Sequence, residues 1–157
     1  MENNEQHLPE EPVIQLVPAN PVKRFANYLV DVIIFSVLLT FLLVIAAPVY
    51  PLMNKIMQKQ PIDLGDQFLI SFLYGLYMSV MEAVLKGKTL GKYITNTRAV
   101  NQDGWPVSSK TAFVRGLLRI IPFEQLSAIS IPSRPWHDRW SGSFVVDERK
   151  SVLPKSK

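Results

Sequence analysis

The side chains best suited to chemistry lie within long apolar segments of the chain. Four polar residues follow the helical spacing i, i+3, i+4 and i+7 and therefore share one helix face: Arg24, Asn27, Tyr28 and Asp31. A charged group inside an otherwise apolar helix faces protein, water or an opposite charge. A second carboxylate, Glu82, lies near the end of the next apolar segment. Antiparallel pairing of the two segments would bring Asp31 and Glu82 to the same end.

These two carboxylates form the candidate ion site. Asp31 and Glu82 could bind a proton or a small cation, with Arg24, Arg115 or Arg119 as the balancing charge. An equally weighted alternative is a structural charge network that fixes the two segments against a following helix. The sequence is compatible with both hypotheses.

Other patterns lack the residues that their chemistry needs. The segment Gly87–Lys92 resembles a nucleotide-binding loop, but its glycines are one residue too close and Tyr93 replaces the magnesium-binding Ser or Thr. His7 and His137 have no cysteine nearby and no zinc-site spacing. We therefore expect no catalytic residues, no metal site, no cofactor and no enzyme activity.

The apolar residues are concentrated in two blocks that are long enough to cross a membrane. Of the chain, 48% is hydrophobic, and the blocks cover about residues 25–47 and 67–85. A spanning helix needs about 20 residues. Between Val32 and Ala47 only Ser36 and Thr40 are polar, so this helix has no solvated face. A chain of 157 residues has too little other material to bury it as a soluble core.

Basic residues beside the two blocks predict the orientation. Six of them flank the blocks and two lie in the connecting loop: Lys23, Arg24, Lys86, Lys88, Lys92 and Arg98 against Lys55 and Lys59. This bias predicts a multi-pass protein of an inner or plasma membrane with both termini cytoplasmic. Lys86, Lys88 and Lys92 are candidates for contact with anionic lipid head groups, and we expect no nucleic-acid partner.

The remaining chain divides into a leader, a membrane domain and a tail. Residues 1–20 read as a flexible polar leader, residues 21–147 as the domain, and residues 148–157 as a basic tail. Alternating β-branched residues and an Asp-Gly turn predict a β-hairpin over about residues 93–108. A strand over about residues 143–147 could pair with Ile94–Val100, although two strands alone are marginally stable.

An amphipathic helix is predicted over about residues 110–121. Arg115 and Arg119 lie on its polar face, and an arginine near the bilayer centre costs about 2.5–3.5 kcal/mol. We therefore expect an interfacial helix, with Arg115 and Arg119 near anionic lipid, and keep a re-entrant or spanning arrangement as the alternative. The fold class is an α-helical membrane protein with a two-helix transmembrane hairpin, this helix and a small cytoplasmic β-sheet. Ser71, Gly75 and Ser79 offer a small-residue face for helix packing.

The order of these elements resembles the RDD family of small membrane proteins, named for one arginine and two aspartates. The resemblance covers about residues 21–147 and rests on five pieces: Arg24 with Asp31, the segment Glu82–Lys92, the turn Asn101–Gly104, the helix containing Arg115 and Arg119, and Trp136–Arg139 followed by Phe144–Val146. It implies that Arg24, Asp31 and Asp138 are the name-giving positions.

The resemblance also implies a range of functions. Most members have no assigned biochemistry, and some are reported as sodium or potassium/proton antiporters. The functional hypothesis is cation/proton exchange through Asp31 and Glu82, with the lipid bilayer, a monovalent cation and a proton as partners. Two spans cannot enclose a water-filled path, so we expect a homo-oligomer or a partner membrane protein. The alternative is a non-catalytic accessory or scaffold protein that binds anionic lipid or a partner protein.

Overall fold

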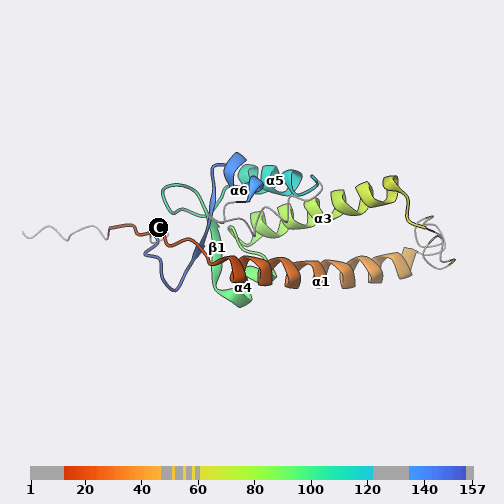
Figure 1. The fold of residues 1–157 in the computed structure, drawn as a ribbon, viewed down its shortest axis with the longest axis horizontal. Coiled ribbons are helices and arrows are strands. Elements are labelled where there is room, and N and C mark those ends of the chain that lie inside the picture. The colour runs from red at the N-terminus through yellow and green to blue at the C-terminus, as the bar shows by residue number, and fades with distance from the viewer. Residues whose placement is uncertain are drawn as a thin grey trace, which may run out of the picture.

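Two long helices extend in one direction from an end that contains all the other elements (Figure 1). A computed structural model describes residues 13–46, 51, 55, 58, 61–121 and 135–154. In chain order the elements are α1 (Pro21–Ala46), α3 (Leu64–Val84), α4 (Leu90–Thr95), β1 (Thr97–Val100), α5 (Ser109–Leu118), α6 (Trp136–Trp140) and β2 (Phe144–Asp147). The end that carries the sheet and the short helices is called the sheet end below.

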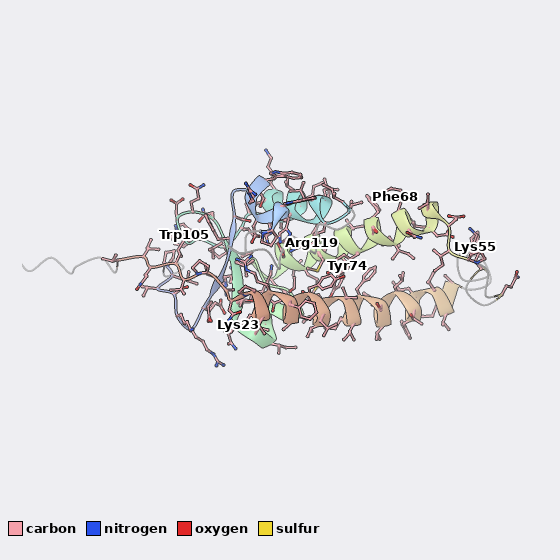
Figure 2. The ribbon with its side chains drawn as sticks, in the orientation of Figure 1. Lys23, Lys55, Phe68, Tyr74, Trp105 and Arg119 are labelled. Carbon is pink, nitrogen blue, oxygen red and sulfur yellow. The ribbon has the colours of Figure 1, made fainter. Side chains whose placement is uncertain are left out.

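The long helices α1 and α3 match the two predicted apolar segments. They have 26 and 21 residues, and only 17% and 28% of their most apolar windows are buried. Phe35 packs edge-on against Tyr74 at 5.3 Å, whereas Phe68 on α3 points away from α1 (Figure 2). The chain therefore leaves most of both apolar surfaces uncovered, as a surrounding of lipid requires.

Part of the predicted hairpin strand is a helix instead. Residues Leu90–Thr95 form α4, because the Thr89 side chain accepts a hydrogen bond from the Lys92 amide and Asn96 ends the helix with φ 55°. Capping residues at both ends outweigh the β-branched alternation on which the prediction rested. The strand β1 is therefore shorter than predicted and begins only at Thr97.

The predicted strand pairing is confirmed. β1 and β2 are antiparallel, with Thr97 opposite Asp147 and Val100 opposite Phe144. The predicted Asp-Gly turn is also present, because Gly104 has φ 80° and Val100 bridges to Pro106. The two strands thus join segments that lie on either side of α5 and α6 in the sequence.

The prediction of a flexible leader is wrong for residues 13–20. The Ala19 amide donates to the Val145 carbonyl at 2.9 Å, and the Asp147 amide donates to the Val17 carbonyl at 2.9 Å. Gln15 also bridges to Val152 in the predicted tail. This extended segment covers the outer edge of β2, which a two-stranded sheet would otherwise expose. Residues 1–12 and 155–157 lie outside the described residues.

Helix α5 packs along the half of α3 that is nearest the sheet end (Figure 1). A Cβ atom on Gly75 would lie 2.6 Å from the Gly116 carbonyl oxygen, and one on Gly116 would overlap Ser79 Oγ and the Gly75 carbonyl oxygen. The predicted small-residue face of α3 therefore receives α5. This close packing fixes α5 along the sheet-end half of α3.

Substitution of Gly116 tests this contact. Gly116→Ala places a methyl group against the backbone of α3, and overpacking of this kind costs about 1–3 kcal/mol. We expect a lower unfolding midpoint for the purified protein in detergent. The matched control is Gly65→Ala at the far end of α3, where the new Cβ meets only the Asp63 side chain at 3.2 Å. Equal midpoints for the two variants would contradict the packing.

Candidate functional site

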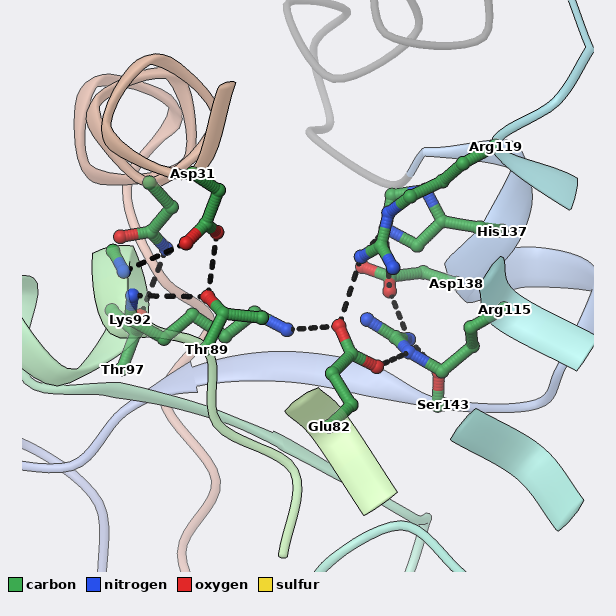
Figure 3. A network of polar contacts seen from close by, with 12 residues as sticks. Asp31, Glu82, Thr89, Lys92, Thr97, Arg115, Arg119, His137, Asp138 and Ser143 are labelled. Carbon is green, nitrogen blue, oxygen red and sulfur yellow. Dashed lines mark hydrogen bonds and ion pairs between the residues drawn. The ribbon is translucent and has the colours of Figure 1, made fainter. Parts of the chain in front are cut away.

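Seven ionisable side chains gather where the helices meet at the sheet end, and Figure 3 shows most of them. Each is at most 7% exposed, and they come from five helices: Arg24 and Asp31 (α1), Glu82 (α3), Lys92 (α4), Arg115 and the adjoining Arg119 (α5), and Asp138 (α6). We call this set the charge network. Six of them were predicted site residues for an ion site or a charge network, and the fold brings all six together.

Glu82 is surrounded by three basic groups. Its carboxylate oxygens lie 2.5 Å from Lys92 Nζ, 2.6 Å from Arg115 Nε and 2.9 Å from an Arg119 guanidinium nitrogen. Glu82 lies in the last turn of α3 and is 0% exposed. The carboxylate thus ties α3 to both α4 and α5. This position makes it a hub of ion pairs.

Asp138 is the second hub. It accepts hydrogen bonds from Arg24 at 2.6 Å and from Arg115 at 2.5 Å. The Arg115 guanidinium also bonds the Ser143 hydroxyl. Burial by itself raises the pKa of Asp138, but the nearby Arg115, His137 and Arg24 lower this pKa more, to well below its usual range. Asp138 is therefore held as an anion, and it pairs with Arg24 in place of the Arg24–Asp31 pair that the sequence left open.

Asp31 has a different environment. It is 1% exposed, and its oxygens accept hydrogen bonds from the Thr89 hydroxyl at 2.6 Å and from the Gly91 amide at 2.8 Å. A Cβ on Gly91 would lie 2.5 Å from the Asn27 carbonyl oxygen, so only glycine lets α4 come this close to α1. Among the described carboxylates of the charge network, Asp31 is the one with no basic group within 4 Å.

A cavity of about 60 Å³ adjoins Asp31. Its lining includes Asp31, Tyr74, Lys92, Arg119 and His137. Since one water needs about 10–15 Å³ of such space, the cavity has room for a few waters or a small ion. Among the described residues there is no group of three His, Cys, Asp or Glu side chains that could hold a metal ion.

The basic residues expected at lipid head groups have separate positions. Lys92 is 3% exposed and paired with Glu82, so the expectation is wrong for this residue. Lys88 pairs with Glu148 at 2.7 Å, while Lys86 is exposed. The expectation that Arg115 and Arg119 contact anionic lipid is likewise wrong, because both are buried in the charge network. Their polar helix face is turned toward the protein.

Several site residues escaped the sequence analysis. Thr89 and Gly91 lie in the segment that was set aside as a false nucleotide-binding loop, and they hold Asp31. Ser143, whose amide donates to the Asp138 carbonyl, and His137, which the sequence analysis considered only as a zinc ligand, lie beside Asp138. Thr89 and Gly91 follow the predicted site residue Glu82 by seven and nine residues, and this spacing along the chain gives no hint that they reach α1.

The two uncovered apolar helices with a buried charge network at one end define a helical membrane protein. The sequence model of the RDD family matches residues 18–146, and the chain belongs to the RDD family. This match confirms the resemblance drawn from the sequence motifs. No curated protein and no solved structure matches the chain.

Removal of the Glu82 charge should destabilise the fold. Glu82→Gln leaves three buried basic groups without this counter-charge, and loss of one partner of a buried pair costs about 3–5 kcal/mol. The control is Glu148→Gln, because Glu148 also binds two basic groups, Lys88 and Arg98, but at a partly exposed site. Such pairs contribute about 0–1 kcal/mol. Denaturation in detergent should separate the two variants clearly, and similar losses would refute the hub role of Glu82.

The buried Lys92 predicts a rise in stability at alkaline pH. Burial, together with Arg115 and Arg119, lowers the pKa of Lys92 from 10.5 to about 8 despite the attraction of Glu82. Between about pH 8 and 10.5 the unfolded chain then binds more protons at Lys92 than the folded chain, so this residue's contribution to stability grows with pH. Unfolding midpoints should be measured at about pH 7.5 and about pH 9.5, on either side of the lowered pKa. The stability of the wild type relative to Lys92→Met should be greater at the higher pH. A constant difference would contradict the lowered pKa.

Proposed function

We propose that this RDD protein exchanges a proton for a monovalent cation at Asp31. The observation that carries the proposal is that Asp31 is a buried carboxylate that borders a cavity and has no ion pair among the described residues. A carboxylate locked to arginines cannot release its charge to a transported ion, whereas one held by a hydroxyl and an amide can bind either a proton or a cation. The proposal includes a multi-pass hairpin in an inner or plasma membrane with both termini cytoplasmic.

The other two carboxylates have a supporting role in this proposal. Glu82, the second predicted ion-site residue, already accepts three basic groups, and Asp138 accepts two arginines. Glu82 therefore serves to hold Lys92 and Arg119 at the cavity wall, and Asp138 holds Arg24 there. Their bound cations are side chains of the protein itself.

The charges around the cavity favour one ion at a time. Lys92 and Arg119 line the same cavity as Asp31, so a second cation added there would meet like charges in a medium of low polarity. Replacement of a proton by a cation leaves the total charge unchanged. The geometry thus supports competition between the two ions. A path across the bilayer would need further walls, which we assign to a homo-oligomer or a partner membrane protein.

A second candidate function is a membrane scaffold. The dense pairing around Glu82 and Asp138 favours it, because this pairing would lock α1, α3, α5 and α6 into one rigid unit. The partner would then be anionic lipid or another protein at the sheet end. This candidate predicts no ion movement by the purified protein.

Proteoliposomes that contain a pH dye distinguish the two candidates. Addition of sodium, potassium or lithium should move protons through wild type, and Asp31→Asn should abolish this flux because an amide cannot ionise. Asp103→Asn in the exposed turn is the matched control and should retain the flux. Both variants should elute as folded protein. The exchange proposal would be contradicted if liposomes with wild-type protein showed no cation-dependent proton movement. It would also be contradicted if the Asp31→Asn variant were as active as wild type.

A further inference from the structure

We infer that α5 is a half-membrane helix, which enters the bilayer from the sheet end and contacts lipid acyl chains with its outward face. This inference rests on α1 and α3 as membrane spans. It does not depend on proton exchange at Asp31.

The depth of α5 follows from its contacts with α3. Gly116 lies against Gly75, and the Ile120 side chain comes within 3.1 Å of a Cβ position on Gly75. Gly75 is nine residues before Val84, the end of α3 at the sheet end. At the rise of an α-helix this is about 14 Å, which is close to half of a hydrocarbon core about 30 Å thick. The end of α5 therefore lies near the middle of the bilayer.

The two faces of α5 differ as this position requires. Phe113, Val114 and Leu117 are 49%, 38% and 41% exposed on the outside, whereas Arg115 is fully buried against Glu82. An arginine at this depth would be costly if it faced lipid, but its charge is paired within the protein. This outer face has the same apolar character as the exposed residues of α3, which include Leu76 and Val80. Acyl chains are thus the occupant that matches this face.

The stretch of chain that contains α5 and α6 has both of its ends at the sheet end. β1 and β2 pair directly, and Asp138 of α6 binds Arg24 near the start of α1. The stretch of chain from Val100 to Phe144 therefore begins and ends on the same side of the membrane. Trp136 and Trp140 stack at 5.9 Å on α6 with 39% and 61% exposure, as is typical of tryptophan at a membrane interface.

Spin-label accessibility tests the depth directly, because the chain has no cysteine. Nitroxide labels on Leu117→Cys, Leu76→Cys and Lys110→Cys can be measured in liposomes with oxygen, which concentrates in lipid, and with a water-soluble nickel complex. Leu76 is the control on α3, and Lys110 is the control at the exposed start of α5. We expect the label at 117 to match that at 76, with high oxygen and low nickel accessibility, while the label at 110 reacts with nickel.

Each other outcome overturns the inference. Nickel accessibility at 117 equal to that at 110 would place α5 at the membrane surface or in water. Low accessibility to both reagents at 117 would show that protein, such as a second copy of this chain, covers the face. Elution of each labelled variant as folded protein shows that the label has not disrupted the packing, and Phe113→Cys provides a second lipid-facing position one turn earlier.

Discussion

The bridging role of Arg115 is the interaction on which the rest of the structure depends. This fully buried guanidinium joins Glu82 of α3 to Asp138 of α6 at distances of 2.6 and 2.5 Å. Two carboxylates in direct contact favour the charged form of the guanidinium, which offsets its loss of hydration. An unpaired charge in such surroundings would cost several kcal/mol. The observed arrangement of the helices pairs all of these groups.

Backbone proximity makes this pairing attainable. Arg115 can reach Glu82 because Gly116, its neighbour on α5, lies against Gly75 without a side chain between the helices. Gly91 has the same role on the other side, where it brings α4 against α1 and its amide to Asp31. Small residues thus set the distances, and the charges set which faces meet. As a result α5 turns its charged face inward and its apolar face outward, which is the reverse of a helix in a soluble protein.

Arg24, Asp31 and Asp138, which the resemblance to the family implied as its name-giving positions, have two separate tasks in this chain. Arg24 and Asp138 form one ion pair, which connects α1 to α6 and, through the Arg24 bond to the Val145 carbonyl, to β2. Asp31 stands apart, held by a hydroxyl and an amide beside a cavity. Glu82 and Asp138 are held in ion pairs, whereas Asp31 is held only by neutral groups. This contrast is the physical basis for the proposed exchange at Asp31.

The sequence by itself determined the elements whose signal is local. Continuous apolar runs predicted α1 and α3, and the Asp-Gly turn with a late β-branched run predicted the pairing of β1 with β2. The helical spacing of Arg24 and Asp31 predicted that both lie on one face. Only the tertiary structure decided which charges meet: Arg24 binds Asp138, 114 residues away, and Thr89 reaches Asp31 across 58 residues. Such partners depend on helix packing through glycines and on capping at Thr89 and Asn96, because a charge alone carries no information about which of several opposite charges it will face.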